Sequence, residues 1–241
     1  MTTTMKNDLV IKNPLTIQER KELRRLPGHD TQGILESLLG ATVPGNIREL
    51  AFHLKSTQLT LIQLAFCDEI VVGPYIETDT NPYLSPKFGD LPRIIASVLG
   101  IPNIDSSIDP SVDEELLTFN PIVYSMIYNL AKNSLNAQIS CGKKLQDTKI
   151  NLTVESYSGF PAKTVYIPDG AKDFSEFFAI RVKNSGREFP EDAPLGELLN
   201  LSSYHFGLPF VKLVAKLLKA PIDIHSGPED TTVSFYHPVY R

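Results

Sequence analysis

The chain has 241 residues, of which 42% are hydrophobic, and it carries a formal net charge of −5 at pH 7, as is typical of a soluble globular protein. The negative charge argues against a general nucleic-acid binder. No apolar stretch approaches the roughly 18–20 residues that cross a membrane. The two cysteines have no histidine partners at the spacing of a structural zinc site. Because the N-terminus also lacks the apolar core of a signal peptide, we expect a cytoplasmic protein. Its length fits one large domain, or a small domain and a medium one.

The N-terminal part predicts a helix that begins at a capping box. Residues 1 to about 14 are polar, and we expect them to be loose. Thr16-x-x-Glu19 follows, a pattern in which each side chain pairs with the other residue's backbone N–H, so a helix is expected from Ile17 to about Leu39. Pro27-Gly28 should kink or split this helix.

A second helix and a domain boundary follow. Beyond a Pro44-Gly45 turn, apolar residues recur at three-and-four spacing from Ile47 to Ala65. Two such helices form a hairpin with an apolar stripe and no core of its own, so we expect two copies to associate in a homodimeric four-helix bundle. Residues 73–90 are rich in Pro, Gly, Asp and Thr, which predicts a linker. The predicted domains are therefore 1–85 and 86–241.

The second domain predicts helices and strands layered in an α/β sandwich, so the expected fold class is α+β with an N-terminal helical hairpin. Helices are expected at about 90–99, 121–137 and 208–219. Strands are expected at about 149–154, 178–182, 222–224 and 232–235. The segment from Tyr157 to Ser175 matches neither pattern, and we interpret it as an insertion or an extended hairpin loop.

The helix expected at 121–137 carries the most informative pattern. Asn120-Pro121 offers an N-cap side chain followed by proline at the first helical position. Asn129, Asn133 and Asn136 then lie at i, i+4 and i+7 on one face. The opposite face is apolar and should be buried; it comprises Val123, Ile127, Ala131 and Leu135. This pattern would arise either from a polar helix face in water or from a row of side chains that bind a ligand. Other motifs must decide between these two interpretations.

Three segments in chain order resemble the N, G1 and G2 boxes of the histidine-kinase-like ATPase superfamily. They are Asn129-x-x-x-Asn133 on a helix, Val182-Lys183-Asn184-Ser185-Gly186 at the end of a strand, and Phe206–Lys212 at the start of a helix. The stretch from Ile222 to Phe235 is similar to the closing hairpin of that family. The resemblance covers about residues 86–241, and the order of the elements is its most specific feature.

The resemblance implies a site for ATP and Mg²⁺. It assigns an oxygen ligand of Mg²⁺ to Asn133 and a phosphate or metal contact to Asn129. Asn184 stands where the family has an aspartate that accepts a hydrogen bond from the adenine amino group. Glycines in both G boxes let the backbone approach the nucleotide. The remaining nucleotide-binding residues that it implies are Gly186, Gly207 and Thr231.

The motifs also depart from the family's pattern. Besides the change at Asn184, Glu188 replaces the second glycine of the G1 box. His205 and Pro209 stand where the G2 box usually has glycines, and Asp230 replaces a glycine in the closing hairpin. Together these replacements predict a degenerate ATP site.

The N-terminal hairpin resembles the dimerisation and phosphotransfer domain that precedes this fold in two-component signalling proteins, where a histidine followed by an acidic residue accepts or relays phosphate. Here the match is His29-Asp30. If the helix is continuous, His29 lies on its exposed face and Asp30 can orient the imidazole for attack on a phosphoryl group. If the helix restarts after Pro27-Gly28, Asp30 is instead its N-cap.

The resemblance leaves three hypotheses for function. The favoured one is a two-component protein that relays phosphate through His29 to or from the aspartate of a response-regulator receiver domain, with a degenerate kinase-type ATP site. The alternatives are an active soluble histidine kinase that uses Mg-ATP and a non-enzymatic dimeric scaffold. All three are homodimers, and none of them needs nucleic acid or a membrane as a partner.

Overall fold

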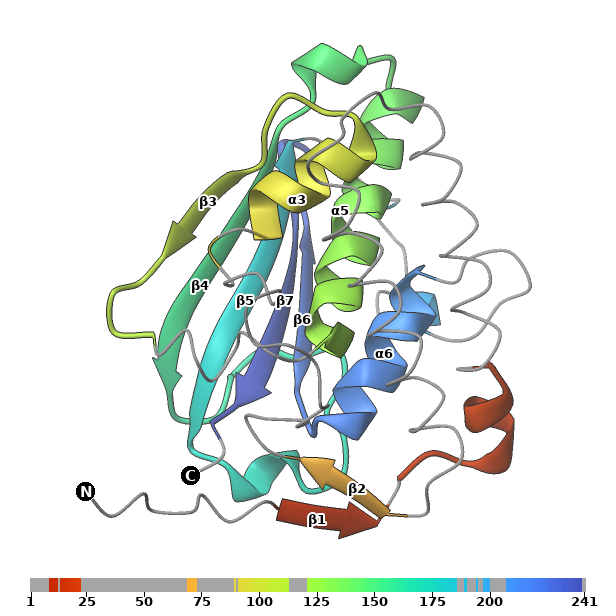
Figure 1. Ribbon diagram of the computed structural model, residues 1–241, viewed down its shortest axis with the longest axis vertical. Coiled ribbons are helices and arrows are strands. Elements are labelled where there is room, and N and C mark those ends of the chain that lie inside the picture. Colours follow the sequence, from red (N-terminus) through yellow and green to blue (C-terminus); the bar gives the residue numbers. More distant parts are fainter. Residues whose placement is uncertain are drawn as a thin grey trace, which may run out of the picture.

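Figure 1 shows a computed structural model of the chain. The structure describes residues 9–12, 14–22, 69–72, 89, 91–112, 121–185, 189, 194, 197–199 and 207–239. Apart from its first turns, the helical hairpin predicted between residues 17 and 65 lies outside these residues, as do His29 and Asp30. The hairpin and the four-helix bundle therefore stay predictions.

A five-stranded sheet forms the centre of the described fold (Figure 1), with the spatial order β3-β4-β5-β7-β6. β3 pairs with β4 in parallel, and the other neighbouring strands are antiparallel. The strands are β3 (Asp105–Ile108), β4 (Ile150–Ser158), β5 (Glu176–Ser185), β6 (Ile222–Ser226) and β7 (Asp230–Pro238). Because successive side chains of a strand alternate between faces, Ile180, Val182 and Asn184 of β5 project to the same side of the sheet.

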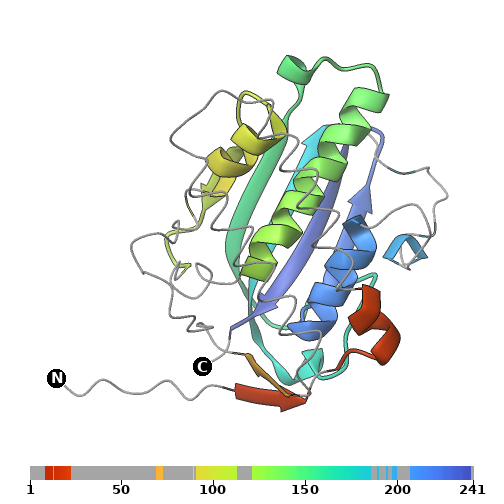
Figure 2. The same ribbon diagram turned by 45° about the vertical axis from the view of Figure 1, so that its right-hand side comes forward.

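That side is covered by α3 (Leu91–Leu99), α5 (Pro121–Ser140) and α6 (Gly207–Leu217), which form a helical layer (Figure 1 and Figure 2). The apolar face predicted for α5 is confirmed, since all four of its residues are buried in the main core, namely Val123, Ile127, Ala131 and Leu135. The hydrophobic core thus lies between the helices and the sheet, and α5 is oriented by burying this face. Within the described part of the chain, no helix has the length and apolar character to span a membrane.

The helices and strands predicted after residue 86 are confirmed, with bounds that differ by a few residues. Two expectations need correction. Residues 9–12, expected to be loose, form β1 (Leu9–Lys12), which pairs antiparallel with β2 (Glu69–Val72). β3 is missing from the prediction because its four residues are largely polar and exposed, and it is held only at the edge of β4. Both strands depend on partners far away in the sequence, which local composition does not reveal.

The connection between β4 and β5, which the sequence leaves as an insertion or a loop, closes one edge of the sheet. The N–H groups of Val165 and Tyr166 donate to the carbonyl oxygen of Ile222 at 2.8 and 3.2 Å, and the Ile222 N–H donates back to Tyr166 at 3.0 Å. This pairing protects the otherwise open edge of β6. On the opposite face of the sheet, the Phe160 ring packs edge-to-face on Phe177 with centroids 6.1 Å apart. The connection is therefore an integral part of the fold.

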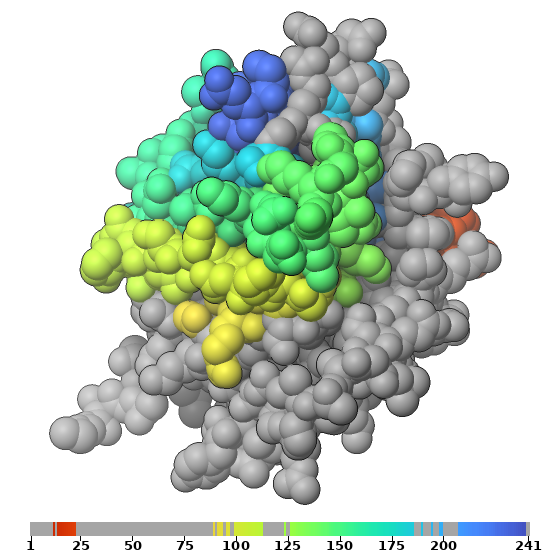
Figure 3. Space-filling view, turned by 90° about the horizontal axis from the view of Figure 1, so that it is seen from above, coloured from red at the N-terminus to blue at the C-terminus, as the bar shows by residue number. Residues whose placement is uncertain are grey.

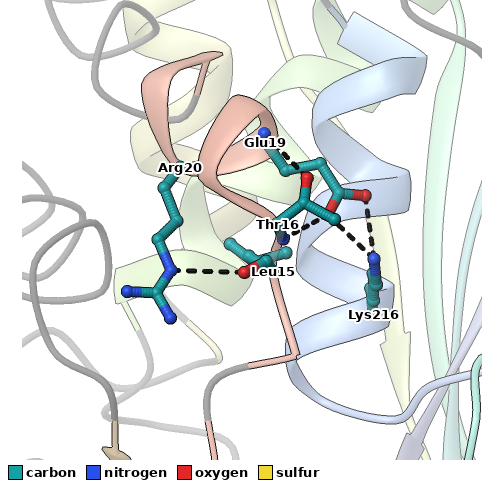
Figure 4. Close-up of polar contacts among 5 residues, drawn as sticks. All are labelled: Leu15, Thr16, Glu19, Arg20 and Lys216. Carbon is teal, nitrogen blue, oxygen red and sulfur yellow. Dashed lines mark hydrogen bonds and ion pairs between the residues drawn. The ribbon is translucent and has the colours of Figure 1, made fainter.

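The capping box at Thr16 is confirmed, and it also ties the N-terminal helix to α6 (Figure 4). The Thr16 N–H donates to Glu19 Oε2 at 2.7 Å, and the Glu19 N–H donates to Thr16 Oγ1 at 3.2 Å. Lys216 Nζ of α6 donates to both carboxylate oxygens of Glu19, at 2.9 and 2.8 Å. Leu15, which precedes the capping box, is buried. The start of this helix is thus held against the C-terminal half of α6.

We expect Lys216→Met to lower the free energy of unfolding by about 0.5–1 kcal/mol at neutral pH. The gain from the ion pair is small because the side chains of Lys216 and Glu19 are still 25% and 22% exposed, so water screens their attraction. Burial alone raises the pKa of Glu19, but hydrogen bonds from Lys216 and Thr16 outweigh it and hold that pKa below its ordinary value of 4.5. The stabilisation is therefore present above pH 4.5 and is lost as the pH falls through the lowered pKa.

Urea unfolding from pH 7 down to pH 3 measures this effect. The unfolding free energies of wild type and Lys216→Met should converge at the acid end. Lys21→Met, at an exposed position of the same helix, should match wild type throughout. If the free energies of unfolding of wild type and Lys216→Met differ by the same amount across this pH range, the ion pair is ruled out as the source of the difference.

Candidate nucleotide-binding site

Two of the predicted site residues that the structure describes, Asn184 and Thr231, lie at one end of the sheet. Asn184, next to last in β5, is paired in register with Ile150 of β4 on one side and Thr231 of β7 on the other. From above, the C-terminal part of α5, the end of β5 and the turn between β6 and β7 lie beside one another in green, cyan and blue (Figure 3). Gly207 begins α6 in contact with α5.

Asn184 is the most unusual residue at this end. Its side chain is only 2% exposed, and neither Oδ1 nor Nδ2 has a hydrogen-bond partner among the described residues. A buried polar group without a partner costs about 1–3 kcal/mol, so such an amide is not retained for stability. The neighbouring Thr231 is also buried, with its Oγ1 3.1 Å from Ser226 Oγ. The strand ends thus present an uncommitted amide beside a hydroxyl pair.

Asn133 and Gly207 make a close contact between α5 and α6. A Cβ atom at position 207 would lie 2.5 Å from Asn133 Nδ2 and 2.8 Å from Asn133 Oδ1, which is closer than non-bonded atoms approach. The backbone of Gly207 is not in the left-handed region, so what position 207 requires is space and not an unusual φ. Glycine at 207 therefore allows the Asn133 carboxamide to occupy its position.

The three asparagines of α5 differ in exposure. Asn129 is only 7% exposed and Asn133 is half-buried, whereas Asn136 is exposed. A helix face that simply points into water would expose all three. The structure therefore favours the interpretation in which Asn129 and Asn133 face other parts of the protein, and it leaves Asn136 as a surface residue.

A buried amide that the sequence analysis missed fixes the adjacent strand ends to α5. Gln138 Nε2 donates to the Lys149 carbonyl oxygen at 2.9 Å, and the Lys149 N–H donates back to Gln138 Oε1 at 2.9 Å. The same Oε1 accepts from Ser185 Oγ at 3.1 Å and from Lys143 Nζ at 3.3 Å, and Lys143 also donates to Ser185 Oγ. Because Ser185 follows Asn184 directly, this network sets where the end of β5 lies.

We expect Gln138→Leu to lower the free energy of unfolding by about 1–2 kcal/mol, because it removes the amide that pairs with both backbone groups of Lys149. Urea denaturation at pH 7 measures the loss. Gln146→Leu, at an exposed position in the connection between α5 and β4, is the matched control and should change stability by less than about 0.5 kcal/mol. Equal effects of the two variants would mean that the network adds nothing.

Several predicted site residues lie outside the described ranges, including Gly186 as well as His29 and Asp30. Among the residues that the structure describes, no three His, Cys, Asp or Glu side chains gather as a metal site. A Mg²⁺ ion held by Asn133 would instead take most of its ligands from phosphate oxygens and water, which is how this ion is usually bound beside nucleotides.

No protein-family model matches the chain, and no curated protein sequence matches it. Solved structures do match it. The histidine kinase domain of the blue-light activated histidine kinase from Erythrobacter litoralis EL346 aligns over 92% of this chain and 94% of its own, with 16% identity and a TM-score of 0.40. The Acinetobacter baumannii histidine kinase AdeS aligns over 90% and 97%, with 10% identity and a TM-score of 0.40.

The catalytic domain of the histidine kinase ThkA aligns over 64% of this chain and 93% of its own, with 16% identity and a TM-score of 0.38. All three neighbours are histidine kinases. Because each TM-score is below 0.5, the case for a function rests on the residues and contacts of this chain.

Those residues fit a nucleotide with its metal ion. Asn184 offers an unpaired amide for the edge of a base, and Asn133 offers a neutral oxygen of the kind that Mg²⁺ accepts. α6 starts beside Asn133, and a helix N-terminus favours a phosphate group because its first N–H groups have no partners within the helix.

Proposed function

We propose that the chain is a histidine-kinase-like signalling protein that binds a nucleotide such as ATP, with Mg²⁺, at this end of the sheet and relays phosphate through His29. Its kinase-type site has lost several motif residues. The observation that carries the proposal is the contact of Asn133 with Gly207. These residues are far apart in the sequence and belong to different motifs. The buried, unpaired amide of Asn184 on the helix-covered side of β5 supports it.

Each residue has its own task in the proposed site. The nucleotide supplies a transferable phosphoryl group, and Mg²⁺ neutralises the charge of the phosphates. Asn133 contributes a neutral oxygen to the metal ion, and Asn129 contacts phosphate or metal. Asn184 holds the base, together with Gly186, two residues further along the sequence, and Thr231, its register partner on β7. The first N–H groups of α6 bind phosphate oxygens, and Gly207 leaves room for the Asn133 carboxamide.

His29 is the proposed phosphate acceptor, on the strength of the His29-Asp30 pattern in the N-terminal hairpin. One imidazole nitrogen attacks the phosphoryl group while Asp30 orients the ring through the other. The phosphate then passes to an aspartate of a response-regulator receiver domain. Two copies of the hairpin pair to form the homodimer.

Labelling experiments test the proposal. For a relay, we expect labelled phosphate on His29 after addition of a phosphorylated receiver domain. The His29→Gln variant should take up no label. Labelling of His29 by Mg-ATP alone would identify an active kinase. This is the second candidate function, and the contact of Asn133 with Gly207 favours it. Failure of both reactions in the wild type would leave only a scaffold. A monomeric mass by gel filtration would contradict the bundle.

A further inference from the structure

Asn184 presents a hydrogen-bond donor and an acceptor side by side, and among the described residues neither has a partner. An asparagine amide can be turned over so that its oxygen and nitrogen exchange places, and only its hydrogen-bond partners fix the orientation. Here no described residue bonds either atom. Of its two register neighbours, Ile150 is apolar, and the hydroxyl of Thr231 can donate or accept. Within the described part of the chain, nothing therefore fixes which way this amide faces.

The two orientations match two kinds of purine. The edge of adenine offers a 6-amino donor next to the N1 acceptor, which pairs with Oδ1 accepting and Nδ2 donating. Guanine and hypoxanthine offer a 6-oxo acceptor next to the N1–H donor, which pairs with the same amide turned over. A carboxylate at position 184 would have acceptors alone and would repel a 6-oxo group. The amide removes that repulsion.

We infer that the site accepts 6-amino and 6-oxo purine nucleotides about equally, with Asn184 as the residue that reads the 6-position by turning its amide. This inference rests on the proposed nucleotide site and concerns only which bases that site takes. It predicts dissociation constants for ADP and GDP within about threefold of each other. It also predicts that purine riboside diphosphate, which has no substituent at the 6-position, binds about tenfold more weakly, since one of the two hydrogen bonds is missing.

Equilibrium titration of the full chain with these three nucleotides and Mg²⁺ tests the inference without any measurement of phosphate transfer. Dissociation constants for ADP and GDP that differ by more than tenfold, in either direction, would overturn it while leaving a nucleotide site in place. Equal binding of purine riboside diphosphate would show that position 6 is not read, which also overturns it. Binding of none of the three would instead overturn the proposed nucleotide site itself.

A variant identifies the residue responsible. In Asn184→Leu the three nucleotides should bind with equal affinity, because leucine cannot distinguish the 6-substituents. Asn151→Leu is the matched control, since Asn151 lies on β4 with an exposed side chain, and it should keep the wild-type ratios. If Asn184→Leu binds nucleotides and keeps the wild-type ratios, another residue reads the base and the inference is wrong.

Discussion

Replacing Asn184 with leucine is expected to make the nucleotide-free protein more stable, by about 2–4 kcal/mol, while weakening nucleotide binding at least tenfold. The side chain is 2% exposed, and both its polar atoms lack partners in the described structure, so the folded state carries the cost of two buried, unpaired groups. Leucine has nearly the same shape and no polar atoms. A gain of stability with a loss of binding is the pattern of a residue retained for function.

Urea denaturation without ligand, together with equilibrium titration of Mg-ADP, measures both effects. Asn184→Asp should act in the opposite direction on stability at pH 7, because it places an unpaired carboxylate in the same buried position. Asn151→Leu on the exposed side of β4 should change neither quantity appreciably. A loss of stability in Asn184→Leu would mean that the amide is paired in solution and has a structural role.

The elements after residue 86 could be predicted because their signals are local. α5 is specified by the proline at its first position and by the repeat of apolar residues every four positions from Val123 to Leu135, all of which are buried as expected. The capping box at Thr16 is equally local, and its two reciprocal hydrogen bonds form. What such patterns do not contain is the identity of distant partners. The ion pair of Glu19 with Lys216 has no signal in the sequence.

The same limit explains the strands that the prediction lacks. β1 pairs with β2 across more than fifty residues, and β3 is a short polar strand whose order depends on β4. The connection between β4 and β5 looks like an insertion until Tyr166 is seen to pair with Ile222 at the far edge of the sheet. Non-local pairing decides each of these cases, and periodicity carries no information about it.

For the candidate site, the sequence gives the residue types and their order, and the structure adds how they are arranged. The motif at Asn184 predicts a contact to a base, but only the fold reveals that its amide is buried without a partner. Gln138 carries no motif at all, and its importance follows from its pairing with the backbone of Lys149. The roles of His29 and Asp30 stay predictions from the sequence pattern.

Gly207→Ala is expected to weaken binding of Mg-nucleotide tenfold to a hundredfold with little change in stability. The added Cβ would lie 2.5 Å from Asn133 Nδ2, so the carboxamide has to rotate away from the position in which the proposed site would use its oxygen as a ligand of the metal ion. Rotating one side chain costs little, and the preference of helices for alanine over glycine counts for less than about 1 kcal/mol at the first residue of a helix, so the unfolding free energy should stay within about 1 kcal/mol of wild type. Titration with and without Mg²⁺ and urea denaturation measure the two quantities.

A double-mutant cycle with Asn133→Ala separates this mechanism from a general disturbance of α6. If Gly207→Ala acts by displacing the Asn133 carboxamide, it should cause no further loss of binding once that carboxamide is gone, so the two effects will be strongly non-additive. Gly227→Ala is the matched control at the same end of the sheet, because its Cβ would lie 3.7 Å from the nearest atoms and strain nothing. Additive losses in the cycle would mean that Gly207 serves the nucleotide through its own backbone, and that Asn133 binds independently of it.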